Sequence, residues 1–450
     1  MGRKRYPLSV APAPPLALPP HVAGLLGEEA DALLEALRQP SPVSIRRNPA
    51  KPADTAGEPV PWCLHGRYLE QRPVFTLDPL LHAGAYYVQE AASMLLEQAL
   101  TACGPLPPNA VALDLCAAPG GKATHLAGWL PPDALLIANE PVRQRQGALA
   151  ENIWKWGRAD VVLTGAEPQA LAPLGAFCHL VVVDAPCSGE GMFRKDPHAR
   201  SQWGPNLVAT CAARQNTILD HAWEALLPGG HLIYSTCTWE TVENEDQVQR
   251  LVDRGAEYVP VPVDPAWGVV ASGPGLRCYP HRMRGEGFFL AALRKPGDQG
   301  AEAVYAKGKR AGSELLPLAQ GWLNEPGRWA GIQGQEVLHA LDHRWLRLVE
   351  TLAVHLPMLN PGLPVAMRKG GKWLPHPVLA LSTALRADAF TALDLPPEEA
   401  LRYLRGEALP ASGAEGTALV RFKGLGLGWV NGAGNRWNNL WPAPWRIRMR

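Results

Sequence analysis

The sequence predicts an α/β fold whose central unit is a doubly wound, mostly parallel sheet. Between Val111 and Lys295, short apolar runs alternate with helix-like stretches, the order expected when each strand is followed by a helix that crosses the sheet. Runs such as 111–115, 134–138 and 179–183 are mostly apolar, with Asp114 and His179 as the exceptions, as strands covered on both faces usually are. Several of these runs end in turns that carry polar residues or thiols. Ligands bind outside the carboxyl ends of the strands in such sheets, so a site is expected there.

The rest of the chain divides around this central unit, 111–295. A chain of 450 residues with 47% hydrophobic residues is long enough for two or three domains. Residues 1–20 are basic and rich in proline, and we expect a disordered tail there; residues 21–110, which begin with a helical pattern at 22–37, form an N-terminal unit. A polar stretch at 296–312 is expected to be a linker, and 313–450 a further region without internal repeats.

Two cysteines that follow predicted strands are the strongest chemical signal. Asp184-Ala-Pro-Cys187-Ser-Gly comes after the run 179–183, and Tyr234-Ser-Thr-Cys237-Thr comes after the run 230–233. Two thiols at one sheet edge suit attack on a pyrimidine, because thiolate addition at carbon 6 makes carbon 5 nucleophilic enough to accept an activated methyl group. An acid near N3 and the exocyclic amine stabilises the adduct. The alternative is that both cysteines are small buried hydrophobic side chains, a common environment for this residue.

A second ligand-binding pattern follows the predicted strand 111–115. A run of small residues and a lysine precedes the helical stretch 123–130: Cys116, Ala117, Ala118, Pro119, Gly120, Gly121 and Lys122. Small side chains let a nucleotide-like ligand approach the backbone, and the helix N-terminus offers free N–H groups. The next strand ends at Asn139-Glu140, where an acid suits ribose hydroxyls. The sequence has neither a G-x-G-x-x-G loop nor a P-loop, which disfavours a dinucleotide or a triphosphate.

These motifs together resemble those of the RNA cytosine-C5 methyltransferases of the Sun/nucleolar-protein family. The resemblance is carried by Asp114-Leu-Cys-Ala-Ala-Pro-Gly-Gly-Lys122, Asp184-Ala-Pro-Cys-Ser-Gly-Glu-Gly191 and Ser235-Thr-Cys-Thr238 with Glu243-Asn244-Glu245. Segments 86–94, 192–197 and 285–289 narrow it to the branch that modifies small-subunit ribosomal RNA. The resemblance runs from about Leu18 to Lys295, and more loosely to the C-terminus.

The resemblance implies a Rossmann-like methyltransferase sheet that uses S-adenosylmethionine. The donor would be held by the loop 116–122 together with Glu140 and Asp184. Cys237 would be the nucleophile, and Cys187 would help to release the product. Asp184 would also face N3 and the amine of the cytosine, with Lys122 as a further contact to the target nucleotide. The family often has an acid near the adenine after the third strand, and Glu167 is the residue that stands nearest to that place here.

The residues alone leave the choice of nucleophile open. DNA cytosine methyltransferases attack with a Pro-Cys thiol, which favours Cys187, whereas the RNA family implies the Thr-Cys thiol of Cys237. A free thiol has a pKa of about 8.5 and needs a lower value to react well near neutrality. The sequence around Cys237 shows no histidine or lysine obliged to provide that shift.

The resemblance also makes 21–110 an N-terminal RNA-binding extension and 313–450 an α+β region with a PUA-like RNA-binding part. No acid follows Glu415, and arginines alternate with tryptophans near the C-terminus: Arg436, Trp437, Trp441, Trp445, Arg446, Arg448 and Arg450. Cations neutralise phosphates and aromatic rings stack on unpaired bases. The other interpretation is that the tryptophans pack a small β core while the arginines are solvated, and both can hold.

The composition is typical of a reduced, cytoplasmic protein. The eight cysteines form no C-x-x-C pair, and the 13 histidines show no ligand spacing, so we expect neither disulfides nor a metal. Prolines interrupt the apolar stretch near the N-terminus, and no run of 18 apolar residues exists, so we expect no signal peptide or membrane span. A net charge of +1 indicates no uniform polyanion-binding surface, and a monomer is expected.

Three functions agree with these observations. The first is methylation of carbon 5 of a cytosine in small-subunit (16S) ribosomal RNA, either free or in the small ribosomal subunit. The second is the same reaction on transfer RNA, which the catalytic motifs do not exclude. The third is a non-catalytic RNA-binding protein of ribosome assembly, which the intact Cys187, Cys237, Asp184 and Lys122 disfavour.

Overall fold

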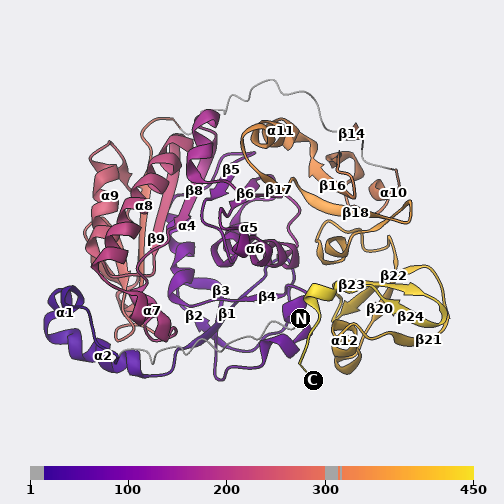
Figure 1. The fold of residues 1–450 in the computed structure, drawn as a ribbon, viewed down its shortest axis with the longest axis horizontal. Coiled ribbons are helices and arrows are strands. Elements are labelled where there is room, and N and C mark those ends of the chain that lie inside the picture. The colour runs from indigo at the N-terminus through magenta and orange to yellow at the C-terminus, as the bar shows by residue number, and fades with distance from the viewer. Residues whose placement is uncertain (1–14, 299–312, 315–316, 450) are drawn as a thin grey trace, which may run out of the picture.

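Figure 1 shows a computed structural model of the chain, which describes residues 15–298, 313–314 and 317–449. A large central sheet has helices on both faces. A small N-terminal sheet lies beside it, and the C-terminal third forms two further sheets, seen at the right in Figure 1. Residues 1–14 of the expected tail and residues 299–312 of the expected linker lie outside the described part.

Five parallel strands form the core of the central sheet: β5 (Val111–Asp114), β6 (Leu135–Asn139), β7 (Val161–Thr164), β8 (Cys178–Asp184) and β9 (Leu226–Thr236). Their spatial order is β7-β6-β5-β8-β9, so the chain first moves outward from β5 and then returns to its other side. Such a reversal leaves a crevice at the carboxyl ends of β5 and β8. The predicted strands are confirmed, although β9 begins before residue 230 with a register irregularity against β8.

Antiparallel strands extend this sheet at both edges. Beyond β9 lie β13 (Phe288–Arg294), β12 (Gly275–Cys278) and β11 (Val270–Ser272), and β10 (Glu257–Tyr258) pairs with β13. At the opposite edge, β17 (Met358–Asn360) pairs with β7. Because β17 comes from the region expected to be a separate C-terminal unit, residues beyond the linker complete the central sheet.

Helices cover both faces of the sheet. On one face, a core that includes Ala112 and Leu136 packs under α4 (Leu96–Ala102), α5 (Gly121–Trp129) and α6 (Arg143–Trp156). On the other face, a core that includes Val111 and Leu113 packs under α8 (Pro205–Ala225), α9 (Glu245–Val252) and α11 (Leu346–His355). Successive strand residues therefore serve opposite faces, as the pleat requires. In the described part of the chain, no helix is long and apolar enough to cross a membrane.

The N-terminal region is a helical hairpin followed by a small sheet. The predicted helix at 22–37 is divided into α1 (Pro20–Leu26) and α2 (Ala30–Arg38), because Gly27 has a φ of +54° and breaks the helix. The sheet has the order β2-β3-β1-β4, formed by β1 (Val43–Arg47), β2 (Glu58–Val60), β3 (Cys63–Leu69) and β4 (Tyr86–Val88), with α3 (Pro79–His82) before β4.

The described residues of the C-terminal third form two sheets. The first has the order β14-β15-β16-β18-β19, made of β14 (Ser313–Glu314), β15 (Trp329–Gln333), β16 (Val337–Asp342), β18 (Leu363–Lys369) and β19 (Lys372–Pro375), with α10 (Pro317–Gln320) beside it. The second has the order β20-β22-β23-β24-β21, made of β20 (Thr391–Asp394), β21 (Leu409–Ala414), β22 (Thr417–Phe422), β23 (Leu425–Gly432) and β24 (Gly434–Asn439), with α12 (Pro397–Leu404) before β21. This second sheet shares a core with the N-terminal sheet, since Ile45 and Tyr86 pack with Tyr403 and Trp441.

Candidate active site

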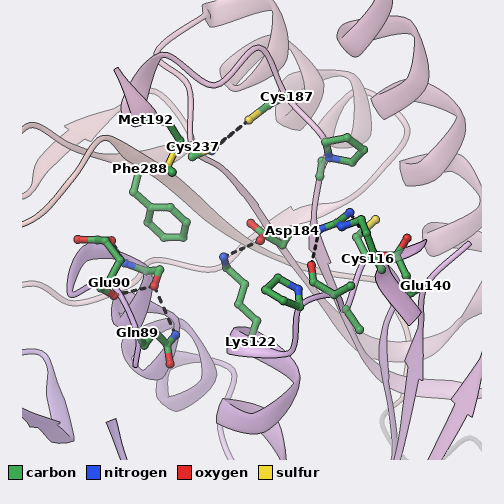
Figure 2. A pocket seen from close by; sticks show the side chains of 18 of the residues that line it. Gln89, Glu90, Cys116, Lys122, Glu140, Asp184, Cys187, Met192, Cys237 and Phe288 are labelled. Carbon is green, nitrogen blue, oxygen red and sulfur yellow. Dashed lines mark hydrogen bonds and ion pairs between the residues drawn. The ribbon is translucent and has the colours of Figure 1, made fainter. Parts of the chain in front are cut away.

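A cavity of about 480 Å³ opens at the carboxyl ends of β5, β6, β8 and β9. Its walls come from the loops that follow these strands, from β4 and from the start of β13. Figure 2 shows two parts on either side of Asp184: Cys187, Cys237 and Phe288 lie toward one end, and Cys116 and Glu140 lie toward the other. Segments far apart in the sequence therefore form one site at the crevice that the strand order creates.

The two cysteines that the sequence singles out lie face to face in this cavity. Their sulfur atoms are 3.2 Å apart, and the backbone N–H of Cys237 points to the Cys187 sulfur at 3.4 Å. The hydrogen bond to Cys237, together with burial, raises the pKa of the Cys187 thiol well above its usual value. Cys187 therefore keeps its proton near neutral pH, and its S–H can donate to the Cys237 sulfur.

A buried acid holds the Cys187 loop in place. The Glu243 carboxylate, fully buried, accepts hydrogen bonds from the Ser188 N–H at 3.0 Å, from the Ser188 hydroxyl, and from Gln215 Nε2 at 2.8 Å. Burial raises the pKa of Glu243 although these hydrogen bonds act against the shift. The Glu243 carbonyl in turn accepts from the Tyr234 hydroxyl at 2.6 Å, so the residues around the two cysteines share one polar network.

A second buried acid joins the loops that follow β8 and β9. Glu190 Oε2 accepts from the Thr238 hydroxyl at 3.1 Å and from the Trp239 N–H at 2.9 Å. The Gly191 N–H donates to the Cys237 carbonyl at 2.8 Å. A Cβ atom at Gly191 would collide with the carbonyl oxygens of Gly287 and Cys237, so only glycine fits between these segments. These contacts fix the distance between the two cysteine-bearing loops.

Asp184 and Lys122 lie between the two parts of the cavity. Lys122 Nζ is 2.8 Å from Asp184 Oδ2, and the Ser235 hydroxyl donates to Asp184 Oδ1 at 2.9 Å. Lys122 also lies over the Phe288 ring, with 5.0 Å between the ammonium and the ring centroid. Its ammonium is therefore held between a carboxylate and a π face at the base of the cavity.

The loop from Cys116 to Lys122 forms the floor of the other part. It turns into α5 at Gly120, whose φ of +118° is a conformation that side chains rarely adopt. The side chains of Ala117 and Ala118 are small, and the loop and the start of α5 face the cavity. The loop thus leaves room for a ligand against the backbone, as the sequence predicts.

Glu140 closes this part from the end of β6. Its Oε1 accepts from the Val142 N–H at 2.7 Å, whereas the buried Oε2 makes no aligned hydrogen bond and has Arg145 at 3.3 Å. Asn139 orients this corner by donating to the carbonyls of Leu115 and Ala166 at 3.1 and 2.9 Å. Glu140 thus places a carboxylate at this end of the cavity, with the half-exposed Arg145 side chain as its ionic partner.

Asp114, at the end of β5, is fully buried behind the loop. Burial, followed by the nearby Asp184 carboxylate, raises the pKa of Asp114 to about 7. Neither of its carboxyl oxygens has a well-aligned hydrogen bond among the described residues. Asp114 is therefore partly protonated near neutral pH, and Asp184 and Glu140 are the acids of this region that line the cavity.

The cavity contains most residues that the sequence predicts and several that it does not. Gly120 shapes the loop without lining the cavity, and Glu167 is exposed and does not line it, so its assignment rests on the family resemblance alone. Several residues that line the cavity stand outside the predicted site: Tyr87, Glu90, Arg145, Met192, Lys195, Arg214, Glu286 and Phe288. Tyr87, Glu90, Glu286 and Phe288 lie in the motifs 86–94 and 285–289, which carry part of the family resemblance and could have indicated these residues. Outside the cavity, three side chains of types that bind metal ions lie close together: Cys63, Glu97 and His125. Hydrogen bonds of 3.0 and 3.1 Å join Glu97 to Cys63 and to His125.

The C-terminal tryptophans pack largely inside the protein. Trp441 is buried and its indole N–H donates to the Trp445 carbonyl at 3.2 Å, while Trp437 and Trp445 pack against the same core. Arg436, Arg446 and Arg448 are exposed. The described residues therefore support core packing for the tryptophans and leave the arginines facing solvent; Arg450 lies outside the described part.

The fold and the site define an S-adenosylmethionine-dependent methyltransferase. Residues 105–294 match the family model described as 16S rRNA methyltransferase RsmB/F. Residues 17–91 match the N-terminal domain of 16S rRNA methyltransferase RsmF, and residues 390–447 match the methyltransferase RsmF PUA domain. With the relatives described next, these matches show that the chain belongs to the 16S rRNA methyltransferase RsmB/F family.

Relatives match over nearly the whole chain. Ribosomal RNA small subunit methyltransferase F from Shigella boydii is 31% identical, with 92% of each chain covered. The protein of the same name from Erwinia tasmaniensis is 31% identical over 87% of this chain and 85% of that one.

Solved structures resemble the central part of the chain. A methyltransferase homolog protein from Pyrococcus horikoshii is 28% identical, with a TM-score of 0.52 over 60% of this chain and 91% of that one. NSun6 from Pyrococcus horikoshii, solved with the ligand SFG, is 21% identical, with a TM-score of 0.53 over 62% of this chain and 97% of that one, and it shares the fold.

Proposed function

We propose that this protein methylates carbon 5 of a cytosine in small-subunit ribosomal RNA through a covalent bond between Cys237 and carbon 6 of the base. The observation that carries this proposal is the pair of thiols 3.2 Å apart in a cavity that also contains Asp184 and Lys122. Membership of the RsmB/F family supports ribosomal RNA as the substrate.

The contact between the thiols favours Cys237 as the nucleophile. The raised pKa of Cys187 keeps a proton on that sulfur, from which it can be donated to a thiolate at Cys237. The thiolate is the reactive form of a cysteine, and a thiol that keeps its proton cannot provide it. Cys187 is thus the donor of the pair and Cys237 the attacking group.

Asp184 and Lys122 suit the polar edge of a cytosine whose carbon 6 lies at Cys237. A carboxylate accepts a hydrogen bond from the exocyclic amine, and the ammonium of Lys122 can supply a proton or a hydrogen bond at the N3 and O2 edge. Addition of sulfur at carbon 6 places negative charge on this edge of the ring, so a fixed cation there stabilises the adduct.

Cys187 can also complete the reaction. Once the Cys237 sulfur is bonded to carbon 6, it no longer makes the hydrogen bond that is the first cause of the raised Cys187 pKa. Cys187 can then release its proton to solvent and, as a thiolate, take the proton from carbon 5. The electrons of that C–H bond restore the ring double bond while the C6–S bond breaks and Cys237 leaves as a thiolate. One proton is released per methyl group transferred.

The other part of the cavity fits S-adenosylmethionine. When bound, the donor supplies an electrophilic methyl group on a cationic sulfur. Glu140 would hold ribose hydroxyls through Oε2 in place of its contact with Arg145, and the loop 116–122 would lie against the rest of the molecule. The carboxylates of Asp184 and Glu140, which line the cavity, complement its positive charge.

Methyl transfer to purified RNA substrates tests the proposal. Protein and radiolabelled S-adenosylmethionine are incubated with small ribosomal subunits, free 16S RNA or transfer RNA, and Cys237→Ala serves as the paired control. We expect label in 5-methylcytosine of ribosomal RNA with the natural protein and none with the variant. Label in transfer RNA alone would retain the chemistry and replace the substrate. Donor binding without transfer to any of these RNAs would favour an assembly protein.

A further inference from the structure

The N-terminal helical hairpin reaches the loops that carry the two cysteines. His21, in the first turn of α1, has its Nε2 atom 3.1 Å from Glu190 Oε1 and 3.4 Å from Glu240 Oε1. Its ring stacks on Trp203 with the centroids 6.1 Å apart and 20° between the planes. A residue more than 160 positions away in the sequence thus contacts both of the segments that follow the two cysteines. In Figure 1, α1 and α2 lie at the lower left, next to α7 (Pro197–Gln202).

Glu190 connects His21 to the cysteines. One of its oxygens binds Thr238 and Trp239, which directly follow Cys237, while the other faces His21. Glu190 itself lies three residues after Cys187 and has no exposed side-chain surface. A carboxylate buried in this way needs a positive partner to remain ionised at low cost.

Apolar packing reinforces this contact. Val22, Leu33 and Leu37 of the hairpin form a cluster with Trp239 and Tyr279. Trp239 is fully buried, its indole stacks on Tyr279 at 5.7 Å, and its N–H donates to the Cys278 carbonyl at 3.1 Å. The hairpin therefore covers the segment that begins two residues after Cys237.

We propose that His21 is a positioning residue for methyl transfer: through Glu190 it holds the Cys187 and Cys237 loops at the spacing that the reaction requires. The role in methyl transfer rests on the function proposed above, whereas the effect on the two thiols does not. The N-terminal hairpin is then part of the catalytic framework, in addition to any contact that it makes with RNA.

The charges around His21 favour its protonated form. Burial alone would lower the pKa of His21, but the short contact with Glu190 and the negative charges of Glu190 and Glu240 outweigh it and raise the pKa, against a smaller opposing effect of Arg277 from β12. Burial and the neighbouring Glu190 likewise raise the pKa of Glu240. With Glu190 ionised, the positioning contact is therefore present below the raised histidine pKa and weakens as pH rises through it.

The test compares His21→Ala and His21→Gln with two matched controls. Glu29→Ala removes the hairpin's contacts with His281 and Arg282 without touching the cysteine loops, and His221→Ala removes an exposed ion pair with Glu224 on α8. For His21→Ala we expect kcat to fall about 10- to 100-fold with KM for RNA changed less than about twofold, the scale of a small misplacement of reacting groups. His21→Gln keeps a donor without the charge and should restore part of kcat. The ratio of natural to His21→Gln activity should fall as pH rises.

A thiol-labelling measurement separates this inference from the proposed function. The rate at which iodoacetamide labels Cys237 is followed by peptide mass in the absence of RNA and donor. We expect His21→Ala to change that rate by more than about threefold, with both controls unchanged. Unchanged labelling and kcat in a folded His21→Ala protein would overturn the inference, as would an equal effect of Glu29→Ala. If His21→Ala alters the labelling of Cys237 but the natural protein methylates none of the RNAs, the positioning contact is supported and the proposed methyl transfer is refuted.

Discussion

Replacing Asp114 with asparagine should change how the stability of the protein depends on pH. Asp114 is fully buried at the end of β5, and its pKa is raised from 3.8 to about 7 by burial and by Asp184. The folded protein therefore binds this proton more tightly than the unfolded chain, and the free energy of unfolding falls as pH rises between these two values. At about 1.4 kcal/mol per pKa unit, the full loss is about 4 kcal/mol.

Most of that loss lies in an accessible pH range. Applying the linkage relation to the two pKa values gives a loss of about 2.5 kcal/mol between pH 5 and pH 8 for the natural protein. Asparagine has no proton to lose, so this component should disappear in Asp114→Asn. The substitution can also change the free energy of unfolding by an amount that does not depend on pH. That amount cancels when the changes with pH of the two proteins are compared.

Urea unfolding at several pH values measures this effect. Tryptophan fluorescence follows the transition, since Trp223 and Trp239 pack around the central sheet. We expect the variant to gain about 2.5 kcal/mol relative to the natural protein on going from pH 5 to pH 8, in the transition of the central sheet. Parallel profiles, differing by a constant over this range, would refute the reasoning, because Asp114 would then titrate as it does in the unfolded chain.

Three further predictions concern the site and the RNA-binding surface. Cys187→Ala should form the covalent bond to the RNA but release the RNA slowly, so a protein–RNA adduct that depends on the donor should persist on a denaturing gel. Rapid turnover without an adduct would contradict the role of Cys187. Lys122→Met and Asp184→Asn should each lower kcat/KM about 10- to 100-fold. Because the two side chains form one pair at 2.8 Å, kcat/KM of the double variant should fall by less than the product of the two single effects. A fall equal to that product would contradict the pairing. The affinity for ribosomal RNA is measured at several salt concentrations. Arg436→Ala and Arg448→Ala should each reduce the slope of log affinity against log salt concentration by about one per lost phosphate contact. Unchanged slopes would show that these arginines do not contact the RNA. Point variants suit this test better than truncation near residue 415, since truncation would remove Trp429 and Trp441 from two cores.

Local sequence patterns predict the parts of the site that lie on strands and their following turns. Cys187 and Cys237 come from such turns, and so do Lys122, Glu140 and Asp184, because the carboxyl ends of parallel strands meet at one edge. Phe288 and Glu286 enter the cavity from an antiparallel strand and the turn before it, whose position against β9 depends on pairing across the sheet.

Contacts between distant segments explain what the sequence does not reveal. His21 reaches Glu190 only because the hairpin packs on Trp239, and β17 joins the central sheet only because the chain returns to β7 between β16 and β18 of the first C-terminal sheet. Neither event leaves a periodic signal in the local sequence. The polar network of Glu243, Ser188 and Gln215 likewise depends on a loop and a helix that meet after the sheet has formed.

The measurement that tests the account most directly is the identity of the cysteine bound to RNA. Ribosomal RNA that carries 5-fluorocytidine at the target position is incubated with the protein and S-adenosylmethionine, and the fluorine prevents the final loss of a proton from carbon 5. The trapped complex is digested and the cross-linked peptide is identified by mass spectrometry. We expect the nucleotide on the peptide that contains Cys237, with none in Cys237→Ala. A cross-link on Cys187 that persists in Cys237→Ala would contradict the assignment of the nucleophile and the roles derived from the thiol pair.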